Sequence, residues 1–469
     1  MTAHRIEHAR AEDFLRSLPD ASVDAVVTDP PYGLSATTPA KVEACLRAWL
    51  SGDDYEHGAK GFMGREWDGW VPGPALWRDV LRVLKPGGHA LVFAGSRTVD
   101  LMGLSLRLAG FEIRDTMQWL YGSGFPKSLD VSKALDRVAG IKRGTKPDLR
   151  NGPNTNGGTK GDKYSLGFSG QGDIDVGPAT DAARAWDGWG TALKPAHEPV
   201  IVARKPPVGT VAANVVEHGT GALNIGGCRV TARDAPAEAE FSQAARSRFV
   251  GVLNGGNTSA CEPRATSTTS AGRWPPNVVL IHPDGCEGDH NGAGCVDGCP
   301  VGELARGGGG RSITGVRSPA SALAAVSGTA WGVDDHRSVE YPGEHGGTAA
   351  RFFPSFHYCA KAARSEREAG LAAPEGARAN RHPTVKPIDA MRWLCRLVTR
   401  PGGLILDPFA GSGTTGCAAA LEGFHFVGCE MDEAHAALAA ARIAHWAPAS
   451  EHAAPDCDVP QLDLFGVAS

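Results

Sequence analysis

The sequence has no long hydrophobic run. Its 469 residues contain no stretch of about 18 apolar residues, which excludes a membrane-spanning helix. The opening residues, MTAHRIEHAR, have no apolar core that could serve as a signal peptide. We therefore expect a cytoplasmic protein with no membrane partner.

The sequence also has neither a disulfide pattern nor a strong overall charge. Its eleven cysteines are odd in number and scattered, which fits reduced thiols better than a disulfide framework. The net charge of -5 gives no general attraction to nucleic acid. Residues 122–163 differ, with nine Lys or Arg against four Asp or Glu. Phosphate contacts require a local basic patch of this kind, although a solvated loop would have the same composition.

Apolar runs alternate with amphipathic segments over the first 121 residues and again over 382–446. This alternation is typical of a doubly wound α/β fold with a mostly parallel sheet. In the first part, WRDVLRVLKPGG at 77–88 predicts a helix closed by Pro-Gly-Gly. The middle of the chain is rich in Gly, Ser and Ala and has few periodic runs. The sequence thus predicts residues 1–206 with a basic loop at 122–190, a loop-rich inserted region at 207–375, a second sheet part at 376–446, and an acidic linker and tail at 447–469.

One predicted strand ends in a rigid polar cluster. Residues 24–35 read DAVVTDPPYGLS, in which the apolar run predicts a buried strand that stops at Asp29. Pro30 and Pro31 cannot donate to a sheet ladder and stiffen the backbone that follows. Asp29 and the ring of Tyr32 are thereby presented at the carboxyl end of a strand, where ligands bind in open α/β sheets. A strand followed by a purely structural proline turn is the alternative.

Another predicted strand ends before a glycine loop. Residues 403–417 read GLILDPFAGSGTTGC, which predicts a strand ending at Asp407, a glycine loop and a helix beginning near Thr414. Glycines let a ligand approach the backbone closely, and N–H groups at a helix start favour an anion. The next strand ends in Glu430, about where a doubly wound fold places an acid on ribose hydroxyls. No Lys follows the glycines, so the pattern indicates a nucleoside site other than a P-loop.

Together these motifs make the chain resemble the β-class S-adenosylmethionine-dependent DNA amino-methyltransferases. TDPPYG at 28–33 is similar to their catalytic motif, and LDPFAGSGTTG at 406–416 to their cofactor motif. HPTVKP at 382–387 is similar to the segment that precedes the cofactor motif, and smaller stretches look like phage and mobile-element members. The catalytic motif comes first, which is the circular permutation of that class. The resemblance implies a circularly permuted class I methyltransferase sheet with an inserted target-recognition domain.

The resemblance assigns roles to single residues. Asp29 and the Pro30 carbonyl would accept hydrogen bonds from the amino group of the target base, next to Pro31, and Tyr32 would stack on the base. S-adenosylmethionine would be the cofactor, with Glu430 on its ribose. The other residues implied to line the cofactor are Asp407, Phe409, Gly411, Ser412, Gly413, Thr414 and Thr415, with Thr384, Lys386 and Pro387 near its methionine part.

The implied function is methylation of the adenine N6 amino group in duplex DNA, either in a restriction-modification system or alone. An exocyclic amino group is a poor nucleophile, and two hydrogen-bond acceptors would stabilise the positive charge that develops on it. The base must be flipped out of the stack, and Tyr32, or less directly Trp67 or Trp70, would stack on it. The alternatives are cytosine N4 in DNA, an RNA or protein substrate, and a catalytically silent DNA-binding module. A homodimer also remains open.

Two features stand apart from the main motifs. Ala9 and Arg10 occupy positions where relatives often carry Gly-Asp, so either Glu12 or Asp13 replaces that contact or the contact is missing. Three cysteines, with His282 and His290 nearby, could supply zinc ligands, but their spacing lacks a paired C-x-x-C and the resemblance requires no metal. We therefore expect no metal site, with free thiols at Cys286, Cys295 and Cys299.

The sequence ends in PQLDLFGVAS, in which residues 461–465 resemble the pentapeptide with which bacterial proteins bind the DNA polymerase sliding clamp. An exposed peptide of this kind would anchor its apolar side chains in a groove, unless those side chains fold back onto the domain. The residues expected to contact the clamp are Gln461, Leu462, Leu464 and Phe465.

We expect a peptide of the last ten residues to bind purified sliding clamp and to lose that binding on Phe465→Ala, because the substitution removes the largest apolar anchor. Fluorescence anisotropy of the labelled peptide measures both affinities. Failure of the unsubstituted peptide to bind would end the clamp hypothesis.

Overall fold

The computed structural model divides into two compact units, residues 1–123 with 197–469, and residues 124–196. The structure describes residues 4–35, 37–58, 61, 66–121, 128–146, 174–175, 177–230, 274–282, 286, 294–297, 299–307, 353, 355–357, 364–371, 379–380, 382 and 384–447.

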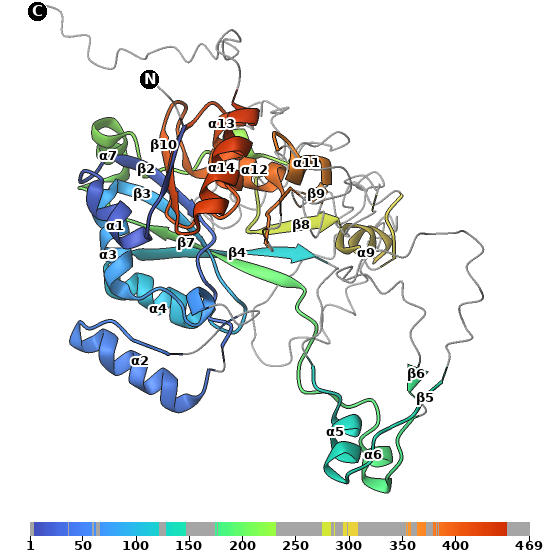
Figure 1. The fold of residues 1–469 in the computed structure, drawn as a ribbon. Helices are drawn as coiled ribbons and strands as arrows, with labels where there is room; N and C mark the ends of the chain where they lie inside the picture. The colour runs from blue at the N-terminus through green and yellow to red at the C-terminus, as the bar shows by residue number, and fades with distance from the viewer. Residues whose placement is uncertain are drawn as a thin grey trace, which may run out of the picture. The chain divides into compact units, whose positions relative to one another are not determined.

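The first unit is built on a nine-stranded sheet with the order β1-β11-β10-β2-β3-β7-β4-β8-β9 (Figure 1). β7 pairs antiparallel with β3 and β4, and the other neighbouring strands pair parallel. β10 and β11, which come late in the chain, lie between β1 and β2, which come first, as the circular permutation requires. The strands are β1 (His4–His8), β2 (Val23–Thr28), β3 (Leu84–Phe93), β4 (Glu112–Tyr121), β7 (His197–Arg204), β8 (Val278–His282), β9 (Ser355–His357), β10 (Leu404–Asp407) and β11 (His425–Glu430).

Helices pack on both faces of this sheet (Figure 1). Successive side chains of a strand point to opposite faces, so Val26 belongs to one buried cluster while Ala25 and Val27 belong to the other. This arrangement confirms the predicted doubly wound, mostly parallel α/β fold of the class I methyltransferase type. One face is covered by α1 (Ala11–Ser17), α2 (Pro39–Ser51), α3 (Pro74–Val83) and α4 (Val99–Ala109), and the other by α12 (Ile388–Val398), α13 (Thr414–Leu421) and α14 (Glu433–Trp446).

One predicted helix boundary is wrong. α3 ends at Val83 and the chain enters β3 at Leu84, before the Pro-Gly-Gly that we expected to close the helix. Leu84 pairs with Val23, and the register then shifts so that His89 pairs with Ala25. The glycines thus belong to an irregularity within the strand, where Gly87 has a φ of +75°.

The predicted inserted region contributes to this sheet. β8 pairs with β4 and β9 pairs with β8, so residues between 207 and 375 extend the edge of the sheet. This region also holds α7 (Val211–His218), α9 (Pro300–Gly307) and α11 (Arg364–Glu368), together with the 3-10 turn η3 (Gly226–Cys228); another such turn, η2 (Glu66–Asp68), precedes α3. The domain boundaries proposed from the sequence stay predictions.

The second unit contains helices where the sequence analysis expected a basic loop. Asp136 on α5 is buried and organises the unit: it accepts hydrogen bonds from Arg143 Nε at 2.6 Å, Ala179 N at 3.0 Å and Thr180 N at 2.9 Å. These bonds join α5 to the residues that lead into α6. The elements are α5 (Val131–Val138), β5 (Thr145–Lys146), β6 (Ile174–Asp175) and α6 (Asp181–Ala185).

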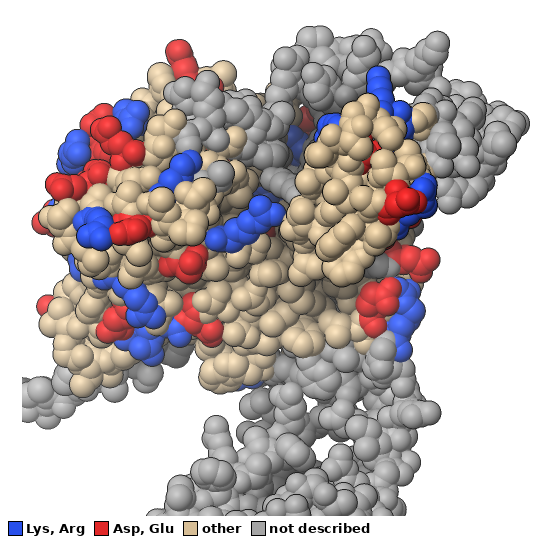
Figure 2. Space-filling model, turned by 90° about the horizontal axis from the view of Figure 1, so that it is seen from below, with Lys and Arg blue, Asp and Glu red and all other residues tan. Residues whose placement is uncertain are grey.

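On the face shown in Figure 2, Lys and Arg side chains are interspersed with Asp and Glu rather than gathered into a field of one sign. This distribution agrees with the small net charge of the chain. Among the described residues, no helix is both long and apolar enough to cross a bilayer.

We expect Asp24→Ala to lower the free energy of unfolding by about 1–3 kcal/mol, because it leaves buried donors without their acceptor. Asp24 is 5% exposed and accepts from Leu404 N at 2.8 Å and from Lys85 Nζ at 2.7 Å, which ties the start of β2 to β10 and β3. Urea unfolding followed by circular dichroism measures the change. Asp13→Ala, at a side chain that is 68% exposed, is the control, and an equal effect of both substitutions would contradict the assignment.

Candidate active site

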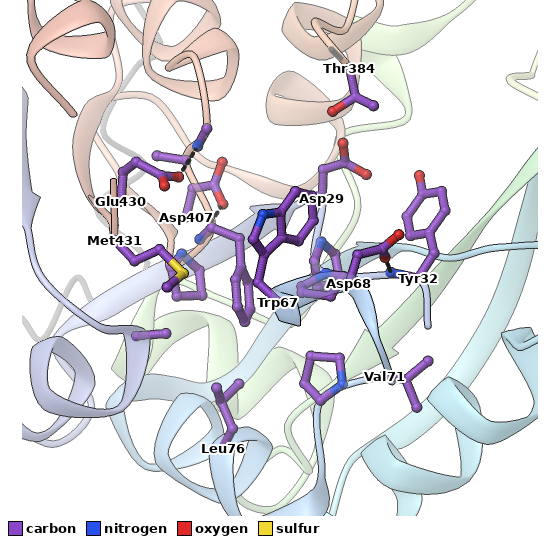
Figure 3. Close-up of a pocket in the computed structure, with 18 of the residues that line it drawn as sticks. Asp29, Tyr32, Trp67, Asp68, Val71, Leu76, Thr384, Asp407, Glu430 and Met431 are labelled. Atoms are coloured by element: carbon purple, nitrogen blue, oxygen red, sulfur yellow. Dashed lines mark hydrogen bonds between the residues drawn. The ribbon is translucent and has the colours of Figure 1, made fainter. Parts of the chain in front are cut away.

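A cavity of about 1050 Å³ opens at the carboxyl ends of β2, β10 and β11. The two motifs, far apart in the sequence, line this one cavity. Figure 3 shows Glu430 and Met431 toward one end of the cavity and Tyr32 and Thr384 toward the other, with Trp67 between them. The strand ends are therefore brought together as the positions of the motifs predict.

At the Tyr32 end, one ammonium group joins two carboxylates and a phenol. Lys386 Nζ lies 3.0 Å from Asp29 Oδ2 and 2.9 Å from Glu198 Oε2, and it donates to the Tyr32 hydroxyl at 3.1 Å. The Tyr32 hydroxyl in turn donates to Glu198 Oε2 at 3.1 Å. Lys386 Nζ also lies 4.8 Å from the centre of the Phe93 ring. These contacts fix the phenol ring beside Asp29.

The other oxygen of Asp29 differs from the rest of the cluster. Asp29 Oδ1 is buried and accepts no hydrogen bond from the described residues. A buried acceptor without a donor is costly, and a native protein retains one where a ligand supplies the donor. Within the cluster, Asp29 Oδ1 is therefore an oxygen that can accept a hydrogen bond from a ligand.

Burial and charge act in opposite directions on this cluster. Burial raises the pKa of Asp29, and the ammonium of Lys386 opposes that rise while Glu198 adds to it. Burial alone would lower the pKa of Lys386, but the carboxylates of Asp29 and Glu198 outweigh it and raise the pKa. Burial, together with both carboxylates, also raises the pKa of Tyr32 well above its usual value, so the phenol stays protonated at neutral pH. The cluster therefore carries its positive charge on Lys386.

The backbone of Tyr32 is held as firmly as its ring. Tyr32 N donates to Asp68 Oδ1 at 2.9 Å, and Thr98 Oγ1 donates to the Tyr32 carbonyl at 2.5 Å. Gly33 has a φ of +67° and lies against the backbone of Trp70, where an added Cβ would be 2.9 Å from Val71 N. The turn after the two prolines is thus closed by η2 and α4, which limits its motion.

Asp407 holds the glycine loop to the neighbouring strand. Its carboxylate accepts from Thr28 Oγ1 at 2.7 Å, Thr415 Oγ1 at 2.7 Å and Phe409 N at 3.1 Å. Burial raises the pKa of Asp407 to about 6, and these hydrogen bonds oppose the rise. Both carboxylate oxygens of Asp407 thus accept hydrogen bonds within the protein, and these bonds fix the conformation of the glycine loop.

The loop itself forms a cradle next to Glu430. Gly411 has a φ of +52°, and a Cβ there would lie 2.9 Å from His382 Nε2, so glycine is required for conformation and for space. Gly411 N donates to Glu430 Oε2 at 2.9 Å and Asp432 N donates to Glu430 Oε1 at 3.0 Å. Each carboxylate oxygen keeps a further lone pair that can accept from a hydroxyl. This end fits the ribose of a nucleoside.

A buried arginine supports the same loop from α14. Arg442 Nη1 donates to the Ser412 carbonyl at 2.5 Å and to Ser412 Oγ at 3.0 Å. Gly413, with a φ of +75°, packs against Ala439 of the same helix, where a Cβ would meet Ala439 Cβ at 2.8 Å. The helix α13 begins directly afterwards at Thr414, as predicted.

Most residues singled out from the sequence line the cavity, but Gly413 and Pro387 do not. Gly413 allows the loop to turn, and Pro387 precedes the first residue of α12. The clamp-binding candidates Gln461, Leu462, Leu464 and Phe465 lie outside the described residues. The predicted residues that line the cavity are Asp29, Pro30, Pro31, Tyr32, Thr384, Lys386, Asp407, Phe409, Gly411, Ser412, Thr414, Thr415 and Glu430.

The two tryptophans that were expected as possible stacking partners of the base, Trp67 and Trp70, differ in exposure. Both line the cavity, but Trp70 is 6% exposed, packs in the core and donates from Nε1 to Cys45 Sγ at 3.2 Å, whereas Trp67 is 40% exposed. Glu12 also lines the cavity, beside Ala9 and Arg10, so of the two candidate replacements Glu12 is the one placed to face a ligand.

Sequence reasoning missed Glu198, Asp68 and His382 as members of the site. Glu198 lies near the start of β7, and it meets Tyr32 from 166 residues away. His382 belongs to the HPTVKP motif, which predicted no role for it. Its ring lies 4.8 Å from the ring of His435 on α14, and both residues line the cavity. No local signal marks such contacts, because they arise only when β7 and α14 are in place.

We expect Lys386→Met to lower the free energy of unfolding by about 2–4 kcal/mol at pH 8, because it leaves two mostly buried carboxylates without a counter-charge. The pKa of Asp29 is raised in the folded protein, so its protonation stabilises the fold at low pH and that stability is lost as the pH rises. The deficit should therefore shrink as the pH falls from 8 toward 5. Urea unfolding at several pH values measures it.

Lys142→Met, at an exposed lysine, is the control and should change stability by about 0.5 kcal/mol or less at each pH. A deficit in Lys386→Met that stays constant with pH would mean that the loss comes from packing instead of charge.

Comparisons with known proteins agree with the motifs. Residues 317–441 match the family model described as DNA methylase, N6_N4_Mtase. The chain is 40% identical over 63 residues to YubD of Escherichia coli (strain K12), a protein named as a methylase, and 37% identical over 62 residues to the DNA adenine methyltransferase YhdJ of the same organism. Each alignment covers 13% of this chain, and they span 28% and 21% of the two relatives.

A solved structure of the PvuII DNA methyltransferase (cytosine-N4-specific) aligns over 94% of this chain and 88% of its own, at 14% identity and a TM-score of 0.37. Similarity at this level carries no weight, and the fold assignment rests on the strand order of the sheet. The two motifs and the matched family model show that residues 317–441 of this chain are similar to the N6/N4 DNA methylases.

Proposed function

We propose that this protein transfers a methyl group from S-adenosylmethionine to the N6 amino group of adenine in duplex DNA. The support comes from the family match and from one cavity that joins a buried carboxylate to a nucleoside cradle. The single observation that carries the proposal is Asp29 Oδ1, a buried acceptor that no described donor satisfies, at the carboxyl end of a central strand.

An amino group on a base supplies the donor that Asp29 lacks. One N–H of that group would bond Asp29 Oδ1, and the other would bond the carbonyl of Pro30, which also lines the cavity. Two such acceptors stabilise positive charge on the nitrogen as it attacks, and they also orient it, which lowers the barrier without a covalent enzyme intermediate. The nitrogen must lose a proton after it gains the methyl group, and Asp29 is the acceptor in contact with that proton.

The residues at the other end of the cavity fit S-adenosylmethionine. Glu430 would accept from the ribose hydroxyls, and the cradle at Gly411 admits a ligand against the backbone. Phe409 and Met431 add apolar surface to the cavity at this end. When bound, this cofactor supplies an electrophilic methyl group on a sulfonium.

Lys386 maintains the charge that the reaction requires. Burial raises the pKa of Asp29, and the ammonium of Lys386 opposes that rise and so favours the carboxylate, the form in which Oδ1 is fully able to accept. Glu198 accepts from Lys386 and Tyr32 together and so holds both against Asp29. Lys386 and Glu198 are thus positioning residues in this reaction.

The preference for adenine rests on the DPPY motif, because the cytosine-N4 members that this chain resembles more often carry serine in place of aspartate. The aligned relative YhdJ is named as an adenine enzyme, over a short stretch. The target atom is unreachable inside a stacked duplex, so the base would be flipped out and would stack on Tyr32 or on the exposed ring of Trp67. Transfer to cytosine N4 would use the same groups and is the runner-up.

DNA is the proposed macromolecular partner, and the basic segment at 122–163 is the proposed source of phosphate contacts. Association with a sliding clamp through residues 461–465 would keep the enzyme on replicating DNA, and a homodimer is a further proposed state. A role in restriction-modification and a cytoplasmic location complete the proposal.

We expect the purified chain to form N6-methyladenine in unmethylated bacterial DNA, and Asp29→Ala to reduce that product by at least about 100-fold, because the substitution removes the acceptor for the developing charge. Mass spectrometry of the digested nucleosides identifies and counts the product. Asp100→Ala, at an exposed acid outside the cavity, is the matched control and should leave the yield unchanged.

Each other outcome has a defined meaning. Formation of N4-methylcytosine would retain the site and correct the base. No nucleoside product, with binding of S-adenosylmethionine shown by calorimetry, would move the substrate to RNA or protein. Undiminished methylation by Asp29→Ala would overturn the mechanism.

A further inference from the structure

A second cluster of reactive side chains lies at the far edge of the sheet, outside the cavity described above. His282 is the last residue of β8, Cys286 follows four residues later, and Cys295 and Cys299 precede α9. The spacing is H-x3-C followed by C-x3-C. Neither of these two pairs has the C-x-x-C spacing typical of zinc sites, and for that reason the sequence alone predicts no metal.

The four side chains converge on one point. Cys286 Sγ, Cys295 Sγ and Cys299 Sγ lie 3.4, 3.5 and 3.4 Å from Nδ1 of His282, and the four ligand atoms all lie within 4.8 Å of one another. In a tetrahedral zinc site, bonds of about 2.3 Å to sulfur and 2.0–2.1 Å to nitrogen place each sulfur about 3.6 Å from the nitrogen. The three sulfur–nitrogen distances match that edge.

Hydrogen bonds to His282 do not account for all three thiols. Nδ1 of a histidine ring has a single donor or acceptor position, so it can serve only one of them, and thiols are weak hydrogen-bond partners. A cation at the centre accounts for all three sulfurs at once.

The composition and burial of the cluster indicate which cation. Thiolate sulfur with imidazole selects zinc among the common divalent ions, whereas calcium and magnesium prefer oxygen. His282 is 2% exposed, Cys286 7% and Cys299 0%, so the cluster is closed to solvent on most sides. Three sulfurs and one nitrogen complete a tetrahedron and leave no open position for a substrate, which is typical of a structural site.

We propose that His282, Cys286, Cys295 and Cys299 bind one Zn²⁺ ion that stabilises the sheet edge. Among the residues that the structure describes, the buried core at this place is small, with Leu280, Cys286, Cys299, Val301 and Ala305 as its buried members. A core of this size gives little stability by itself, and metal ligation is a common way to supplement it.

The position of the ion gives it a connection to the active-site cavity. Ile281, next to His282, pairs with Tyr121 of β4, and Tyr121 lines the cavity. The ion would fix the end of β8. Because β8 pairs with β4, it would also fix β4, which contributes Tyr121 to the cavity wall. The proposal is independent of the proposed methylation, because it rests on ligands that do not contact the cavity.

The test begins with metal analysis of the full chain, purified without a polyhistidine tag and without chelator. Inductively coupled plasma mass spectrometry should find about one zinc per chain, and Cys299→Ser and His282→Ala should each reduce it at least about tenfold. Cys395→Ala, at a buried cysteine in the main core, is the matched control and should keep its zinc.

Cobalt provides a readout that does not depend on the folding of any variant. The unsubstituted chain, stripped of zinc and loaded with Co²⁺, should show the intense visible absorption of tetrahedral cobalt and the ultraviolet charge-transfer band of cobalt–thiolate bonds. Absence of both zinc and these bands in the unsubstituted chain would overturn the proposal. So would a zinc content that Cys299→Ser and His282→Ala leave unchanged.

Discussion

The site depends on one buried carboxylate. Asp407 accepts from Thr28 at the end of β2 and from Thr415 at the start of α13, so a single side chain joins two strands whose sequences lie 379 residues apart. Thr28 directly precedes Asp29, and Phe409 directly follows the Asp407-Pro408 pair. The distance between the catalytic and the cofactor motif is therefore set by these bonds. A change in the loop would move both motifs together.

Charge within the cavity is balanced by one lysine against two acids. Lys386 lies between Asp29 and Glu198, with the Tyr32 hydroxyl beside all three. Two carboxylates this close would favour protonation of one of them, and the ammonium opposes that protonation. The same three contacts draw together β2, β7 and the segment before α12, so the electrostatic balance and the shape of the cavity have a common origin.

The sequence predicted the elements that depend on local patterns. The buried strand before Asp29, the glycine loop after Asp407 and the helix from Thr414 are where their residue types require them. Contacts over long separations could not be predicted: Glu198 and Arg442 belong to a regular strand and helix, and only the assembled sheet brings them to the loops. The convergence of Cys286, Cys295 and Cys299 on His282 could not be predicted either, because their three-residue spacings lack a paired C-x-x-C and only the folded chain brings the four side chains together.

The strand order has a consequence for folding. β1 and β2 lie within the first 28 residues, yet they pair with β11 and β10, which begin after residue 403. During synthesis, those early strands therefore have unpaired edges until almost the whole chain has been made. Folds dominated by such distant pairings form slowly, since a long loop must close before any contact compensates for it. The part of the sheet formed by β1, β11, β10 and β2 is accordingly expected to assemble last, and the N-terminal half alone would be prone to aggregation.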